Sequence, residues 1–125
     1  MENIHIEGTA RSPYVHFNAE TGELEISGRS IPEHAINFYK PLLDWLEQYM
    51  NNPKLQTKMV FNLEYFNTAS SKCILDLLRQ LEKVQETNKT EVSVKWFYDD
   101  GDEDMEESGN DFKSLINLNI ELHSK

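Results

Sequence analysis

The segment from residue 58 to residue 86 constrains the fold more than any other part of the chain. Apolar and polar side chains alternate over residues 58–65, which is typical of a β-strand. The polar run 67–71 follows at once, and apolar residues at helical spacing then predict a helix from about Ser70 to Glu86. A strand that leads directly into an amphipathic helix indicates a sheet with helices packed on it.

The first half of the chain adds strands and one long helix. Short strands are predicted at residues 4–6, 14–17 and 23–27, with a hairpin turn at 18–22 that uses the positive φ open to Gly22. The helix is predicted from about Ala35 to Met50. Pro41 lies inside this pattern, where it kinks the helix or marks its first turn. Trp45 falls off the main apolar stripe.

The second half continues the alternation of strands and helices. A strand is predicted at 92–98, a short helix around 112–116 after an acidic segment, and a last strand at 118–122. In the central strand, Tyr65 is predicted on the face of Met59 and Leu63, and Phe66 on the opposite face. The chain is therefore predicted to be an α/β protein, with a mixed β-sheet packed with helices and one domain spanning residues 1–125.

Charge and composition exclude several classes of protein. The formal net charge of −10 disfavours binding to nucleic acid or to an anionic membrane surface. No apolar run is long enough to span a membrane, and residues 1–5 lack the pattern of a secretory signal, so a cytoplasmic location is expected. The single cysteine, Cys73, forms no intrachain disulfide and is expected to be buried.

The sequence offers little catalytic or metal-binding chemistry. It lacks a glycine-rich phosphate loop and any His or Cys metal spacing, so we expect no metal and no cofactor. Glu64 and Asp76 form a candidate carboxylate pair for acid–base catalysis. One alternative function is therefore a small enzyme that uses Glu64 and nearby polar groups. The acidic segment 99–111 fails as a calcium loop because Met105 stands where the turn glycine is needed. An acidic helix start is the favoured interpretation, although ion or basic-partner binding stays open.

The polar run 67–71 places Thr68 at the amino end of a helix. Unpaired N–H groups and the helix dipole favour negative charge there, so a phosphate on Thr68 would be held. On local pattern alone, a helix cap formed by Asn67 or Thr68 is the more common use of such residues. Ser70 and Ser71 share this ambiguity of position.

Three stretches of the sequence resemble the SiaC family of bacterial regulatory phosphoproteins. They are the central Leu63-Glu64-Tyr65-Phe66-Asn67-Thr68-Ala69-Ser70-Ser71, the later Trp96-Phe97-Tyr98-Asp99-Asp100, and Asp102-Glu103-Asp104-Met105. The early Ile6-Glu7-Gly8-Thr9 and Ser12-Pro13, and Pro32-Glu33 before the first long helix, also fit. The strand followed by Asn-Thr and Ser-Ser at a helix start is the most specific part.

The resemblance implies a fold similar to the STAS domains of anti-sigma-factor antagonists, and a non-enzymatic signalling protein. It implies that Thr68 is phosphorylated by a Ser/Thr kinase with a histidine-kinase-like ATPase fold and dephosphorylated by a PP2C-type phosphatase. The unphosphorylated form is then expected to bind and activate a diguanylate cyclase that controls biofilm formation. An alternative is an anti-sigma-factor antagonist in a partner-switching pathway. The expected partner-binding residues are Tyr65, Phe66, Asn67, Thr68, Ser70 and Ser71.

Overall fold

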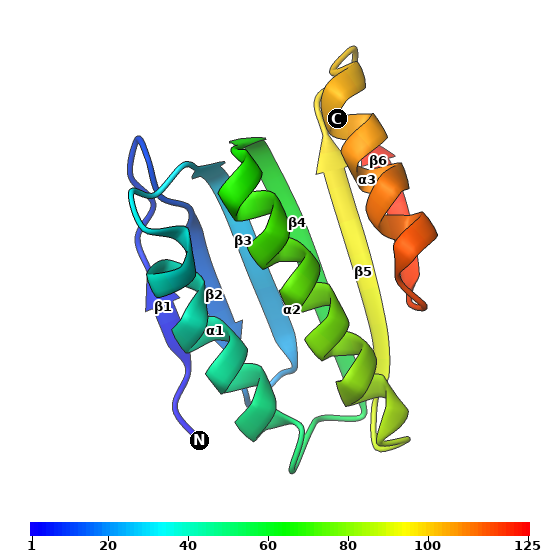
Figure 1. Ribbon diagram of the computed structural model, residues 1–125. Coiled ribbons are helices and arrows are strands. Elements are labelled where there is room, and N and C mark those ends of the chain that lie inside the picture. The colour runs from blue at the N-terminus through cyan, green and yellow to red at the C-terminus, as the bar shows by residue number, and fades with distance from the viewer.

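The computed structural model describes residues 1–125 as a six-stranded sheet with three helices on one of its faces (Figure 1). The strands are β1 (Ile4–Ile6), β2 (Tyr14–Asn18), β3 (Glu23–Ser30), β4 (Gln56–Phe66), β5 (Glu91–Tyr98) and β6 (Asn119–Ser124). The helices are α1 (Ala35–Tyr49), α2 (Thr68–Glu86) and α3 (Glu103–Leu115).

The order of the strands across the sheet follows their order in the chain. Strands β1, β2 and β3 pair antiparallel, whereas β3 to β6 pair parallel and are connected through the three helices. Crossovers between parallel strands are right-handed, and this chain always steps in the same direction, so all three helices fall on one face (Figure 1). The prediction of a mixed sheet packed with helices is confirmed.

The core lies between that face of the sheet and the helices. Alternate residues of β2 to β6 point into it, as the period of two requires. Of its 26 members, the largest that are fully buried are the aromatic side chains Phe17, Tyr39, Tyr49, Phe61 and Trp96. The opposite face of the sheet is not covered by a helix and carries mostly polar side chains. None of the three helices has the length and apolar character needed to cross a membrane.

A β-bulge near the end of β4 makes the predicted facing of Tyr65 and Phe66 wrong. Leu63 pairs with Gly28, but Tyr65 pairs with the next residue of β3, so Glu64 is an extra residue in β4. An extra residue reverses the side-chain alternation beyond it. Tyr65 is consequently 50% exposed, and the Phe66 ring packs on the helix-covered side.

Helix α1 differs from its prediction at Trp45. The helix already begins at Ala35 and continues through Pro41, so this proline does not mark its first turn. Trp45 is only 7% exposed, because its ring stacks on Tyr49 with centroids 5.1 Å apart and its Nε1 donates a hydrogen bond to the Glu2 carbonyl at 2.7 Å. The amino-terminal segment thus buries a residue that the helical pattern alone leaves exposed.

Helix α3 takes up most of the acidic segment. It begins at Glu103, well before the predicted short helix, and the Asp102 carboxylate caps it by accepting from the Met105 N–H at 3.1 Å. Acidic residues in the first turn complement the helix dipole, as the favoured interpretation of this segment requires. The helix approaches β5 closely, since a Cβ at Gly109 would lie 2.5 Å from the Trp96 ring.

Candidate functional site

The site that the sequence singles out is the junction between β4 and α2. Asn67 is the helix cap: its side-chain oxygen accepts from the Ser70 N–H at 2.9 Å, and its carbonyl accepts from the Ser71 N–H at 2.9 Å. Thr68 is therefore the first residue of α2 and not its cap. The Thr68 side chain is exposed, and its hydroxyl takes part in no hydrogen bond within the protein.

Two backbone N–H groups at this junction have no partner. The Asn67 carbonyl accepts from the Ser71 N–H, and the Asn67 side chain accepts from the Ser70 N–H. The N–H groups of Thr68 and Ala69 are therefore unpaired. They lie at the positive end of a 19-residue helix. The junction therefore presents an exposed hydroxyl beside two free donors, an arrangement that suits a phosphate.

A buried chain of hydroxyl groups anchors this first turn of α2. The Ser70 Oγ donates to the Ser30 carbonyl at 2.9 Å and accepts from the Ser30 Oγ at 2.8 Å. The Ser30 Oγ is also 2.6 Å from the Tyr39 hydroxyl. Burial raises the pKa of Tyr39 to about 12. The hydroxyl groups thus tie α2 to β3 and α1 beneath Thr68.

This chain of hydroxyls gives Ser70 a role that differs from the predicted one. Ser70 is fully buried, so its side chain cannot contact a partner protein at the surface. Of the other expected partner-binding residues, Tyr65 and Thr68 are exposed, and Phe66, Asn67 and Ser71 are partly exposed. The surface available at the junction is therefore formed by five of the six residues.

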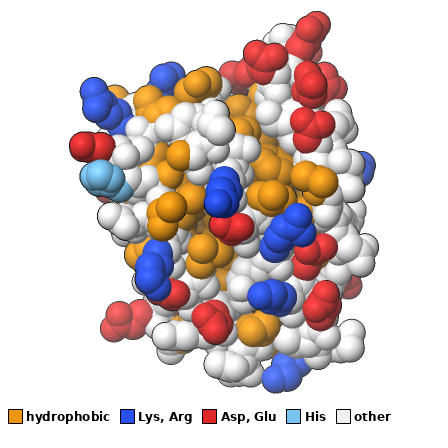
Figure 2. Space-filling view, in the orientation of Figure 1, with side chains coloured by type: hydrophobic (Ala, Val, Ile, Leu, Met, Phe, Trp, Pro, Cys, Tyr) orange, Lys and Arg blue, Asp and Glu red, His pale blue; other side chains and the backbone are white.

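A groove of about 360 Å³ runs between α2 and α3 from Thr68. Figure 2 shows hydrophobic side chains gathered between these two helices on the helix-covered face. Lys72 lies on the α2 side, one turn after Thr68, and Leu115, which is 56% exposed, lies on the α3 side. The groove is lined by Thr68, Ser71, Lys72, Leu75, Ser108, Asp111, Phe112 and Leu115.

Aromatic side chains support the other side of the junction. The Tyr65 ring lies under the Arg29 guanidinium, whose carbon is 5.8 Å from the ring centroid. The Phe66 ring packs edge-on against Trp96, with centroids 6.0 Å apart, and near Phe112 at 6.3 Å. Tyr65 therefore belongs to the surface, whereas Phe66 links the end of β4 to α3 and the groove.

The other candidate chemistries find no arrangement to support them. Asp76, one member of the candidate carboxylate pair, is eight residues beyond Thr68 in α2, about 12 Å along the helix axis. It is therefore too far from the β4–α2 junction to act there as an acid or base. Burial raises the pKa of the Cys73 thiol, which makes this side chain a poor nucleophile. In the acidic segment, the Asp102 side chain caps α3, and Glu103, Asp104 and Glu106 lie in its first turn.

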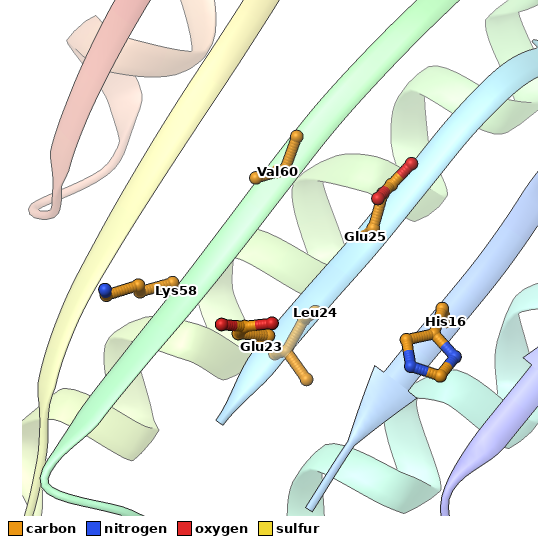
Figure 3. A pocket seen from close by; sticks show the side chains of 6 residues that line it. All are labelled: His16, Glu23, Leu24, Glu25, Lys58 and Val60. Carbon is orange, nitrogen blue, oxygen red and sulfur yellow. The ribbon is translucent and has the colours of Figure 1, made fainter. Parts of the chain in front are cut away.

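A second hollow, of about 230 Å³, lies on the open face of the sheet, away from Thr68. Figure 3 shows that its residues come from β2, β3 and β4. They are His16, Glu23, Leu24, Glu25, Lys58 and Val60. This set contains no nucleophile next to a base, so nothing here replaces the β4–α2 junction as the leading site.

Sequence reasoning missed the residues that surround Thr68 in space. The position of Lys72 near Thr68 could have been predicted, because residues four apart lie on one face of a helix. The α3 side of the groove and the Tyr39–Ser30–Ser70 chain could not. The hydrogen-bonded pairs of this chain are 9 (Ser30 to Tyr39) and 40 (Ser30 to Ser70) positions apart and join three different elements, which meet only in the folded protein. No local pattern carries that information.

Solved structures share this fold over nearly the whole chain. Apo-SiaC from Pseudomonas aeruginosa has a TM-score of 0.89 at 26% identity, covering 98% of this chain and 99% of that one. A crystal structure of the diguanylate cyclase SiaD in complex with its activator SiaC, from the same organism, matches with a TM-score of 0.90 at 26% identity, again covering 98% and 99%. The predicted STAS-like architecture is confirmed by these structures.

Sequence comparison leads to the same group of proteins. An uncharacterized protein of Pseudomonas aeruginosa (strain UCBPP-PA14) is 29% identical over 113 residues, which cover 90% of this chain and 89% of that protein. The model of the SiaC family of regulatory phosphoproteins matches residues 6–125, which include the β4–α2 junction and the groove. The chain therefore belongs to the SiaC family of regulatory phosphoproteins.

Proposed function

We propose that this protein is a non-enzymatic signalling switch whose state is set by phosphorylation of Thr68. One observation carries the proposal: the Thr68 hydroxyl is exposed and unbonded at the start of α2, next to two unpaired N–H groups. Among the hydroxyls of the 67–71 run, Ser70 is buried and fully hydrogen-bonded, so it is closed to a kinase. Residues 1–125 act together as one regulatory domain.

A phosphate on Thr68 is stabilised where it forms. It carries about −1.5 to −2 charges at neutral pH and lies at the positive end of the α2 dipole. Lys72 is one turn further along α2 and lines the same groove, so its ammonium reaches the phosphate from the i+4 position. Charge and free donors therefore converge on one acceptor.

The enzymes that set the state are a Ser/Thr kinase with a histidine-kinase-like ATPase fold and a PP2C-type phosphatase. The effector is a diguanylate cyclase, which the unphosphorylated chain binds and activates, linking the switch to biofilm formation. The cyclase assignment is supported by the structural match to an activator that was crystallised with a diguanylate cyclase. An anti-sigma factor is the alternative effector, and no feature of this chain favours it.

The switch acts through the surface around Thr68. In the unmodified chain, Tyr65 and the apolar wall of the groove offer contact area that a partner can desolvate. A phosphate at the edge of this surface adds charge and strongly held water, which disfavours docking. The partner then dissociates without any change in the fold of the switch.

Incubation of the chain with ATP and its partner kinase, followed by intact-mass measurement and site mapping, tests the acceptor. We expect a single phosphate on Thr68 and none on Thr68→Ala. Ser71→Ala is the matched control, because Ser71 lies in the same turn and lines the same groove. This control should be phosphorylated like the unaltered chain.

Two results would overturn the proposal. A phosphate mapped to Ser71 or to another residue would move the acceptor. An unmodified chain in the presence of a kinase that phosphorylates its other substrates would remove the switch altogether. Circular dichroism of each variant establishes that a missing phosphate does not come from unfolding.

A further inference from the structure

The first two strands place two histidines opposite each other on the open face of the sheet. His5 of β1 is the antiparallel register partner of His16 of β2. Their Nδ1 atoms are 3.4 Å apart. Ile4 and Ile6, on either side of His5, are partly buried against the hydrophobic core, which favours this register.

The distance between the two imidazoles matches the requirement of a metal ion. Tetrahedral zinc holds imidazole nitrogens at about 2.0–2.1 Å, which places two of them about 3.3–3.4 Å apart. The two Nδ1 atoms meet this separation without movement of the backbone. Imidazole is a ligand for Zn²⁺, Ni²⁺ and Cu²⁺ alike.

The His5 Nδ1 is hydrogen-bonded to the His16 Nδ1 when no ion is bound, so a metal ion would take the place of the proton that the two nitrogens share. The His5 Nε2 is 2.8 Å from the Glu7 Oε1. An ionised carboxylate only accepts hydrogen bonds, so the proton of a neutral His5 lies on Nε2. A carboxylate behind a histidine in this way fixes its tautomer and orientation in metal sites. The Tyr14 ring also packs against His5, nearly perpendicular to it at 5.4 Å.

We propose that His5 and His16 form a binding site for a divalent transition-metal ion, held by both Nδ1 atoms on the open face of the sheet. No group of three His, Cys, Asp or Glu side chains is arranged to hold an ion, so the two imidazoles are the ligands that the protein supplies. Water molecules fill the remaining positions of the ion. The site is far from the β4–α2 junction and does not depend on the proposed switch.

The remaining histidines provide matched controls. His123 on β6 also contacts a carboxylate, Glu121, at 3.2 Å, but it stacks on Phe97 and has no second imidazole. His34 precedes α1 and makes no contact with another histidine. A contribution from any exposed imidazole would therefore appear in these residues as well.

Calorimetric titration of the untagged, EDTA-stripped chain with NiCl₂ or ZnCl₂ tests the site. We expect one ion per chain in the unaltered protein. Removing a ligand in His5→Ala or His16→Ala should weaken binding by more than the loss of its outer partner in Glu7→Gln, which is expected to cost on the order of tenfold. His34→Ala and His123→Ala should bind like the unaltered chain.

A gain of binding gives a second, independent test. Glu25 is the register partner of His16 on β3, on the same face of the sheet. Glu25→His therefore adds a third imidazole to the row and should tighten binding. Equal binding by the chain and the double variant His5→Ala/His16→Ala, with both folded by circular dichroism, would overturn the proposal, as would loss of binding in His123→Ala.

Discussion

The carboxyl and amino ends of the parallel strands are both tied to α1 by buried hydroxyl groups, yet only one end carries an exposed hydroxyl at a helix start. At the carboxyl end, the chain of hydroxyls joins Tyr39, Ser30 and Ser70. Thr68 lies above it, exposed and unbonded at the first position of α2. Ser70 thus anchors the first turn of α2, whereas the Thr68 hydroxyl, two residues earlier, is left exposed.

At the amino end, the Thr57 Oγ1 lies 2.8 Å from the Tyr49 hydroxyl and 2.7 Å from the Thr90 Oγ1. The Lys54 N–H also donates to Tyr49 at 3.1 Å, so every member of this chain is used in packing the fold. No helix begins there. A buried hydroxyl chain is therefore a structural device in this fold, and the proposed phosphorylation needs the free helix terminus in addition.

The largest expected effect concerns the amino end. At Gly22, φ is +76° and a Cβ would lie 2.3 Å from the Gln56 carbonyl oxygen, so Gly22→Ala combines backbone strain with a clash. We expect it to lower the free energy of unfolding by about 3 kcal/mol or more. Gly101→Ala is the control, since its φ is +90° but no atom lies within 4 Å of the new Cβ. Urea unfolding that gives equal losses for both would contradict the role of the close contact.

A second prediction uses alkaline pH at the carboxyl end. Burial raises the pKa of Tyr39 from 10.0 to about 12, so the unfolded chain loses this proton at lower pH than the folded one. The stability contributed by the neutral phenol is complete below pH 10 and is lost as the pH rises to about 12. This loss should amount to about 2–3 kcal/mol. Tyr39→Phe should lack this component when unfolding is measured from pH 9 to 12, and a parallel loss in both proteins would contradict the assignment.

Removing one hydroxyl from each buried chain compares the two ends directly. Ser70→Ala and Thr57→Val should each destabilise the protein by about 1–3 kcal/mol, because partners are left unsatisfied in the core. Only Ser70→Ala should also change the rate at which the kinase phosphorylates Thr68, since only Ser70 anchors that turn. Denaturation and phosphorylation kinetics on the same samples check both parts. An equal change of rate in Thr57→Val would show that the two ends are not independent.

The smallest expected effect is that of Lys72 on the phosphorylated chain. Its i+4 pairing with a phosphate on Thr68 should stabilise the protein by about 0.3–0.5 kcal/mol at low salt. Lys72→Gln should remove this increment while leaving the unmodified chain nearly unchanged. Thermal unfolding with and without the phosphate measures the difference. If the phosphate stabilises Lys72→Gln as much as it stabilises the unaltered chain, the stabilisation comes from the helix terminus alone and Lys72 has no part in it.

Most of the fold could be predicted from local patterns. The alternation in β4 and β5 and the helical spacing in α2 survive in the structure because each lies against a single buried layer. The bulge at Glu64 was not predictable, since an extra residue is visible only in the pairing with β3. The burial of Trp45 is not visible in the helical pattern for a similar reason: the amino-terminal segment that covers it lies 43 residues earlier in the sequence.

The candidate site was predictable as a position but not as an environment. The order of residues places Thr68 at a strand-to-helix junction, and that placement holds. Whether Asn67 or Thr68 caps the helix depends on backbone geometry, and the buried role of Ser70 depends on contacts with Ser30 and Tyr39. One wall of the groove is formed by α3, which begins inside the acidic segment, where the sequence predicted no long helix.

The central claim is that a phosphate on Thr68 controls docking of an effector. Calorimetric titration of a diguanylate cyclase from the same organism with the unmodified chain, and with the chain fully phosphorylated on Thr68, tests it most directly. We expect the unmodified chain to bind, and the phosphorylated chain to bind about tenfold more weakly or worse, a difference of about 1.4 kcal/mol or more. Equal affinity of the two forms for the cyclase would contradict the account.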